Sequence, residues 1–196
     1  KFESVISKER GLHMNNIRNK NKNNHGHLYS DYCWLLDSNV YFDDDILFKF
    51  INDLRNDNSL SSISSLCLCK FSKTVHNSDN NNHLYDTLAF SYGKYNYTNT
   101  ANTCLMKNCD SCINHREKHS PYRIPEEDLI VVGSKIYPEC VFCSHSLIKT
   151  EIYNKVKWTG EYGFEETDWY GFFKSIGYYG RICMDTSIIS FKSVNR

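Results

Sequence analysis

A short apolar run followed by a helical stripe constrains the fold of this chain more than any other feature. Residues 32–36 read Tyr-Cys-Trp-Leu-Leu, which is typical of a strand buried on both faces. Apolar residues then recur at helical spacing over 46–54, and the next apolar segment, 62–71, has strand character. A strand, a helix and a second strand in this order predict an α/β fold.

The rest of the chain continues this alternation and shows no internal repeat and no linker, so we expect one domain over residues 1–196. Three aspartates, Asp43 to Asp45, precede the 46–54 stripe and are expected to cap that helix and oppose its dipole. Further expected elements are a short helix around Met14–Arg18 that ends at Asn21–Gly26, strands at 129–132, 139–147, 182–184 and 188–189, and helices at 146–156 and 169–176, the last followed by Gly177.

Charge and composition argue against several classes of protein. The chain has 23 Lys and Arg against 23 Asp and Glu, and a neutral chain is not typical of a dedicated nucleic-acid-binding protein. No apolar run approaches the roughly 20 residues of a membrane-spanning helix. Nine cysteines are an odd number, so at least one thiol has no intrachain disulfide, which favours a reducing, cytoplasmic compartment.

The turn Asp37-Ser38-Asn39, which ends the first predicted strand, is the first candidate site. Ligands of open α/β sheets gather beyond the carboxyl ends of strands. Oxygen ligands one residue apart can converge on Mg²⁺ or Mn²⁺, and such a cation would bridge a substrate diphosphate. The alternative is an ordinary solvated turn.

A second candidate site lies at the start of the helix predicted near residue 169. The carboxylates of Glu165, Glu166 and Asp168 crowd together there, and mutual repulsion raises the pKa of one of them towards that of a general base. Trp169 adds a flat apolar face on which a sugar ring could stack. The alternative is that the acidic residues only complement the helix dipole.

The cysteines include two Cys-x-x-Cys pairs, 109/112 and 140/143, a spacing often associated with zinc. The second pair encloses Val-Phe and resembles the interior of a strand, where successive side chains alternate between faces, so zinc between the pairs is disfavoured. Buried structural thiols are the alternative. The better zinc candidate is the local cluster Cys104, Cys109, Cys112, His115 and His119.

Taken in order, these segments resemble GT-A glycosyltransferases over about residues 15–191. Trp34 to Val40 resembles the family's apolar strand ending in Asp-x-Asp. The Asn- and Lys-rich composition also resembles glycosyltransferases of large DNA viruses such as chloroviruses and mimiviruses. Ile17-Arg18-Asn19 is similar to the GT-A family's Arg-Asn helix, and Tyr85-Asp86-Thr87 is similar to a tract of fungal capsule-associated mannosyltransferases. Gly163 to Trp169 is similar to the GT-A family's Glu-Asp-x-Asp block. Gly177-Tyr178 with Asp185 is similar to that family's Gly-Tyr … Asp-Pro ending.

The resemblance implies a GT-A-like, Rossmann-like fold with a mixed, mostly parallel sheet flanked by helices, in one domain that lacks the family's first strand. It implies an enzyme of the inverting type, with a retaining mechanism as the alternative. This enzyme moves a sugar from a nucleotide-sugar donor to a hydroxyl of a glycan or glycoprotein, in the host cytoplasm if the chain is viral. The resemblance implies Glu166 as base with Asp168 orienting the acceptor, Arg18 and Asp37 at the donor, Tyr85 and Asp86 at the acceptor, and Asp37 with Asn39 at a Mn²⁺ or Mg²⁺ ion. To these we add Lys192 at the donor, for its charge, and Trp169 at the acceptor, for its flat ring.

The chain departs from the family pattern at the metal. Asn39 replaces the second aspartate, and Ser190-Phe191-Lys192 stands where a histidine often completes the site. A lysine ammonium can oppose phosphate charge directly, so we expect weak metal dependence with Lys192 sharing the cation's role. The alternative is a solvated lysine near the C-terminus. Two other functions remain open: a zinc-stabilised binding module without catalysis, and a degenerate GT-A fold that binds sugars without turnover.

Overall fold

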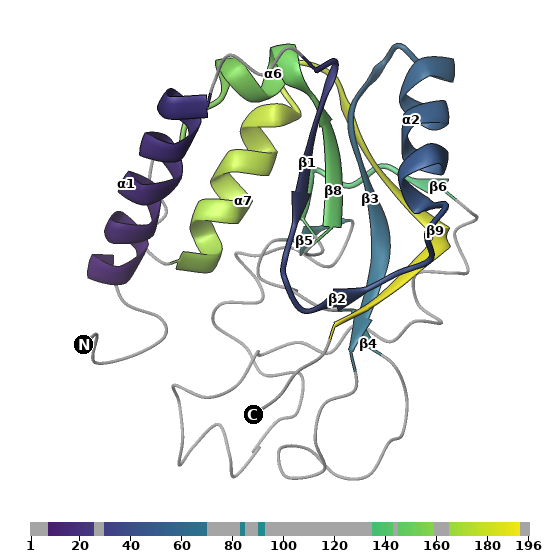
Figure 1. Ribbon diagram of the computed structural model, residues 1–196, viewed down its shortest axis with the longest axis horizontal. Helices are drawn as coiled ribbons and strands as arrows, with labels where there is room; N and C mark the ends of the chain where they lie inside the picture. The colour runs from purple at the N-terminus through teal and green to yellow at the C-terminus, as the bar shows by residue number, and fades with distance from the viewer. Residues whose placement is uncertain are drawn as a thin grey trace, which may run out of the picture.

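The computed structural model describes residues 8–25, 30–69, 83–84, 90–92, 135–142, 145–158 and 165–192. Helices lie on both faces of a mixed sheet, so the α/β class is confirmed (Figure 1). No helix in these ranges is long and apolar enough to cross a membrane. The helices are α1 (Lys8–His25), α2 (Ile46–Asn56), α6 (Thr150–Lys155) and α7 (Glu165–Ile176).

The main sheet has the strand order β1-β8-β3-β9-β2, with β4 paired to β3 and β6 paired to β9, while β5 and β7 form a separate two-stranded sheet. The strands are β1 (Tyr32–Leu36), β2 (Val40–Tyr41), β3 (Leu60–Cys69), β4 (His83–Leu84), β5 (Phe90–Ser91), β6 (Lys135–Ile136), β7 (Cys140–Val141), β8 (His145–Lys149) and β9 (Arg181–Lys192).

The expectation of a mostly parallel sheet is wrong for the described strands, among which only β3 and β9 pair in parallel. The reason is the position of β8, which lies between β1 and β3 and is antiparallel to both. Strands β1, β3 and β9 nevertheless run in one direction, as a β1–α2–β3 crossover requires. Their carboxyl ends therefore lie at one edge of the sheet, the lower one in Figure 1, which we call the C-terminal edge.

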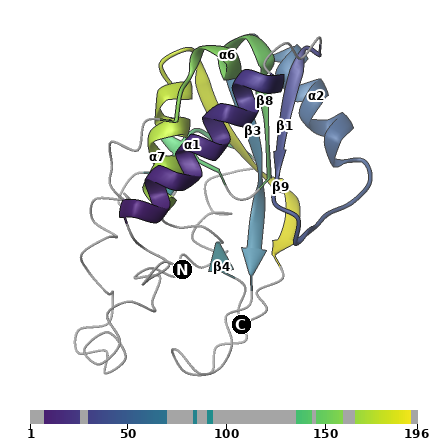
Figure 2. The same cartoon turned by 60° about the vertical axis from the view of Figure 1, so that its left-hand side comes forward.

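Helix α2 covers one face of the sheet, as the apolar stripe predicts (Figure 2). Its buried side chains Ile46, Phe50 and Leu54 pack against residues of β3, β8 and β9. The expected side-chain cap is absent at this helix: Asp45 occupies the N-cap position without a capping hydrogen bond. Its carboxylate instead pairs with Lys49 at 2.9 Å, one turn further on.

Helices α1, α6 and α7 lie on the other face. Helix α1 runs to His25 and is longer than the predicted short helix, although its sequence is mostly polar. Its docking is specific: the Asn19 amide donates to the Trp158 carbonyl at 2.8 Å and accepts from the Trp158 N–H at 3.2 Å. The Trp158 ring in turn stacks on Phe172 of α7, with centroids 3.8 Å apart.

The C-terminal half divides differently from the sequence expectation. The expected strand 139–147 is split between β7 and β8, and the strands expected at 182–184 and 188–189 belong to the single strand β9. Within β9 the register against β3 shifts between Asp185 and Ile189. Gly177 follows α7 as predicted, and its N–H donates to the Phe173 carbonyl. The strand expected at 129–132 lies outside the described residues.

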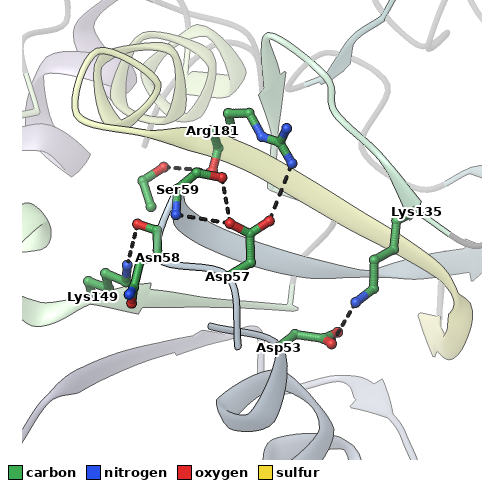
Figure 3. Close-up of polar contacts among 8 residues, drawn as sticks. Asp53, Asp57, Asn58, Ser59, Lys135, Lys149 and Arg181 are labelled. Atoms are coloured by element: carbon green, nitrogen blue, oxygen red, sulfur yellow. Dashed lines mark hydrogen bonds and ion pairs between the residues drawn. The ribbon is translucent and has the colours of Figure 1, made fainter. Parts of the chain in front are cut away.

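A polar network joins the opposite edge of the sheet (Figure 3). The Asp57 carboxylate accepts from the N–H and hydroxyl of Ser59, and these bonds lower its pKa. It also pairs with Arg181 at 3.3 Å, and Lys135 pairs with Asp53 at 2.6 Å. The Asp57–Arg181 pair holds the start of β9 to the turn between α2 and β3, and the Asp53–Lys135 pair holds β6 to α2.

Candidate active site

The structure brings together two residues that the sequence proposed for one site, although they are 155 positions apart. The Lys192 ammonium lies 2.5 Å from the Asp37 Oδ2 atom. The side chain of Lys192 is only 7% exposed, whereas that of Asp37 is 34% exposed. The ammonium is therefore buried and the carboxylate reaches solvent above it.

The backbone explains how these side chains meet at the C-terminal edge. After β1 the chain turns at Asp37, whose carbonyl accepts a hydrogen bond from the Val40 N–H. It then forms β2, which is antiparallel to the end of β9 and places Val40 opposite Lys192. The pairing of β2 with β9 thus holds the turn against Lys192. The alternative of a solvated lysine is wrong.

At this turn the structure describes an ion pair, and the expected Mn²⁺ or Mg²⁺ site of Asp37 and Asn39 stays a prediction. The only carboxylate in the Asp37-Ser38-Asn39 turn is already bound by an ammonium, and Asn39 is exposed and contributes a neutral amide. Within the described ranges no three His, Cys, Asp or Glu side chains are grouped as metal ligands. A divalent ion bound to the Asp37 carboxylate would lie close to the Lys192 ammonium, and the two cations would repel each other.

Arg18 is placed on α1, where its guanidinium lies 4.8 Å from the centre of the Trp158 ring. The Trp158 ring stacks on Phe172 of α7, so the Arg18 guanidinium, the Trp158 ring and the Phe172 ring together connect α1 to α7. This contact gives Arg18 a structural role. Its part in donor binding stays a prediction.

The acidic block is helical, as predicted: Glu165 to Trp169 form the first turn and a half of α7. Helix α7 starts towards the C-terminal edge and ends beside the start of β9 (Figure 1), so this backbone lies at the same end of the sheet as Asp37. The side chains of Glu166, Asp168 and Trp169 lie outside what the structure describes. Also outside it are Tyr85 and Asp86 and the zinc candidates Cys104, Cys109, Cys112, His115 and His119.

The sequence interpretation missed His145, the first residue of β8. Its imidazole is fully buried among the rings of Trp34, Phe42 and Phe50, with centroids 4.7–5.5 Å away. Burial lowers its pKa to about 4, so the ring is neutral at neutral pH. A histidine inside the predicted strand 139–147 was the only sequence signal for it.

Buried polar contacts connect His145 on β8 with serines on the neighbouring strands β3 and β9. Its Nδ1 lies 3.4 Å from the Ser65 hydroxyl, which is 2.7 Å from that of Ser190. Since His145 is the register partner of Leu36, the residue before Asp37, this cluster lies directly behind the candidate site. Because the His145 ring is enclosed, we interpret this cluster as a structural contact that stabilises the C-terminal edge of the sheet.

A hollow of about 430 Å³ lies beside α2 and the start of β1. Its walls include Tyr32, Trp34, Ile51 and Arg55, and none of its lining residues is a predicted site residue. It is therefore a separate feature from the Asp37–Lys192 pair.

Comparison with known proteins adds no family assignment: the chain matches no protein-family model, and no curated protein is similar to it in sequence.

Proposed function

We propose that this protein is a glycosyltransferase that moves a sugar from a nucleotide-sugar donor to a hydroxyl group of a glycan or glycoprotein. The observation that carries the proposal is the meeting of Asp37 and Lys192 at the C-terminal edge of an α/β sheet. That edge is where open α/β sheets bind ligands. The resemblance to GT-A enzymes assigns Asp37 to the donor site, and the ammonium of Lys192 can oppose the charge of a donor diphosphate.

In the proposed reaction, the acceptor oxygen attacks the anomeric carbon as the bond from that carbon to the diphosphate oxygen breaks. Glu166 takes the proton of the acceptor hydroxyl, and the nucleoside diphosphate leaves with the bonding electron pair. Asp37 accepts hydrogen bonds from donor hydroxyl groups. Asp168, with Tyr85, Asp86 and Trp169, orients the acceptor, and Arg18 contributes to the donor site.

The proposal places this reaction in the cytoplasm. Cys33 and Cys183 are buried thiols outside any disulfide, and burial raises their pKa values to about 11 and about 12. Such thiols are typical of proteins in a reducing compartment.

A thermal-shift screen against UDP-, GDP- and CMP-sugars tests donor binding. We expect one nucleotide class to raise the melting temperature selectively. If none does so, with or without Mn²⁺, the proposal is wrong. Stabilisation without transfer or donor hydrolysis would instead indicate a sugar-binding protein without turnover.

The base is tested by comparing Glu166→Gln with its neighbour Glu165→Gln. Loss of a general base lowers the rate by about 10²–10⁴-fold, and we expect this only for Glu166→Gln, with donor affinity little changed. A larger loss for Glu165→Gln would assign the base to the neighbouring position.

A further inference from the structure

We propose that Lys192 is a built-in cation that lets the site bind a nucleoside diphosphate without a divalent metal ion. This inference rests on the proposed function, and it assigns the positive charge at the donor site to the Lys192 ammonium. Lys192 acts through Asp37 and is therefore a positioning residue.

The two side chains of the Asp37–Lys192 pair are buried to different degrees. The ammonium lies underneath, with its side chain 7% exposed, and the carboxylate lies above it, 34% exposed. A ligand that approaches the C-terminal edge therefore meets Asp37 first. Lys192 fixes the orientation of Asp37 through Oδ2, and β2 fixes the position of Lys192 through its pairing with the end of β9.

The ion pair also removes the net negative charge of Asp37. A bare carboxylate at a diphosphate site repels the ligand, and a divalent ion normally removes this repulsion by bridging the two anions. Here a lysine from the other end of the chain neutralises the carboxylate at 2.5 Å. The neutral pair retains the oxygen acceptors that recognise ligand hydroxyls, and it no longer needs a metal.

The experiment measures the binding of UDP and of GDP by calorimetry, in EDTA and in saturating Mn²⁺. The variants are Lys192→Met, which keeps the length of the side chain without its charge, and Lys192→Arg, which keeps the charge. The matched control is Lys135→Met, because Lys135 of β6 forms an ion pair of similar length, 2.6 Å, with Asp53 of α2, away from Asp37.

We expect the parent protein and Lys135→Met to bind one of these nucleotides equally well in EDTA and in Mn²⁺. Lys192→Met should bind about tenfold more weakly in EDTA, the effect of losing one charge-assisted contact. Mn²⁺ should restore that binding, because Asp37 is then available as a ligand. Lys192→Arg should bind as the parent does. Rescue by Mn²⁺ distinguishes a charge role from a purely structural one, which no metal would restore.

Two results would overturn the inference, and they separate it from the proposed function. If the parent protein binds a nucleotide only with Mn²⁺, the built-in cation is wrong while the proposed function stands. If the parent binds no nucleotide under either condition, the proposed function is wrong as well. The measurement on the parent remains decisive even if Lys192→Met does not fold.

Discussion

The buried histidine predicts a specific dependence of stability on pH. His145 is enclosed by Trp34, Phe42 and Phe50, and its Nε2 atom is buried with no hydrogen-bond partner among the described residues. Desolvation by burial disfavours the charged imidazolium and lowers the pKa of His145 from 6.5 to about 4. The unfolded chain, in contrast, protonates this imidazole near its ordinary pKa.

This difference in the pKa of His145 sets how the free energy of unfolding changes with pH. Between pH 6.5 and about 4 the unfolded state binds one more proton at His145 than the folded state does. The stability is therefore fully present above pH 6.5 and is lost as the pH falls, at about 1.4 kcal/mol per pH unit. Over the whole interval the loss amounts to about 3 kcal/mol.

Urea unfolding of the parent protein and of His145→Phe measures this effect. Phenylalanine suits the aromatic surroundings and does not titrate, and the other seven of the eight histidines are common to both proteins. The parent-minus-variant difference in the free energy of unfolding should be constant above about pH 7 and fall steadily below pH 6.5. A difference that does not change between pH 6.5 and 4.5 would refute the assignment of a buried, neutral His145, whatever the constant offset from packing.

Three further predictions concern packing. Asn19→Ala removes the two hydrogen bonds between the Asn19 amide and the Trp158 backbone, and it should lower the free energy of unfolding by about 1–3 kcal/mol. An unchanged urea midpoint would argue against these hydrogen bonds. Phe50→Ala should cost about 3–5 kcal/mol, whereas Phe48→Ala, on the same helix but 69% exposed, should cost under about 0.5 kcal/mol; similar losses would contradict the orientation of α2. Cys183, whose pKa burial raises to about 12, should react with a thiol reagent at mildly alkaline pH only after unfolding, as mass spectrometry of the labelled protein would show.

Local patterns predicted those elements whose burial repeats along the chain. The stripe Ile46, Phe50 and Leu54 located α2, because a helix that packs on a sheet must bury one face. The run 32–36 located β1, and Gly177 marked the end of α7. Helix α1 was underestimated because its stability depends on contacts such as Asn19 with Trp158, which leave no periodic signal.

The sequence by itself determined the α/β class, the strand that ends at Asp37 and the acidic start of α7, because these depend on hydrophobic periodicity and on residues adjacent in the chain. Only the tertiary structure decided the antiparallel insertion of β8, since strand pairing is set by contacts between distant segments. The tertiary structure also identified Lys192, among the lysines of the chain, as the buried partner of Asp37. An ion pair between residues 155 positions apart depends on the path of β2 and β9 through space, and no spacing in the sequence encodes that path.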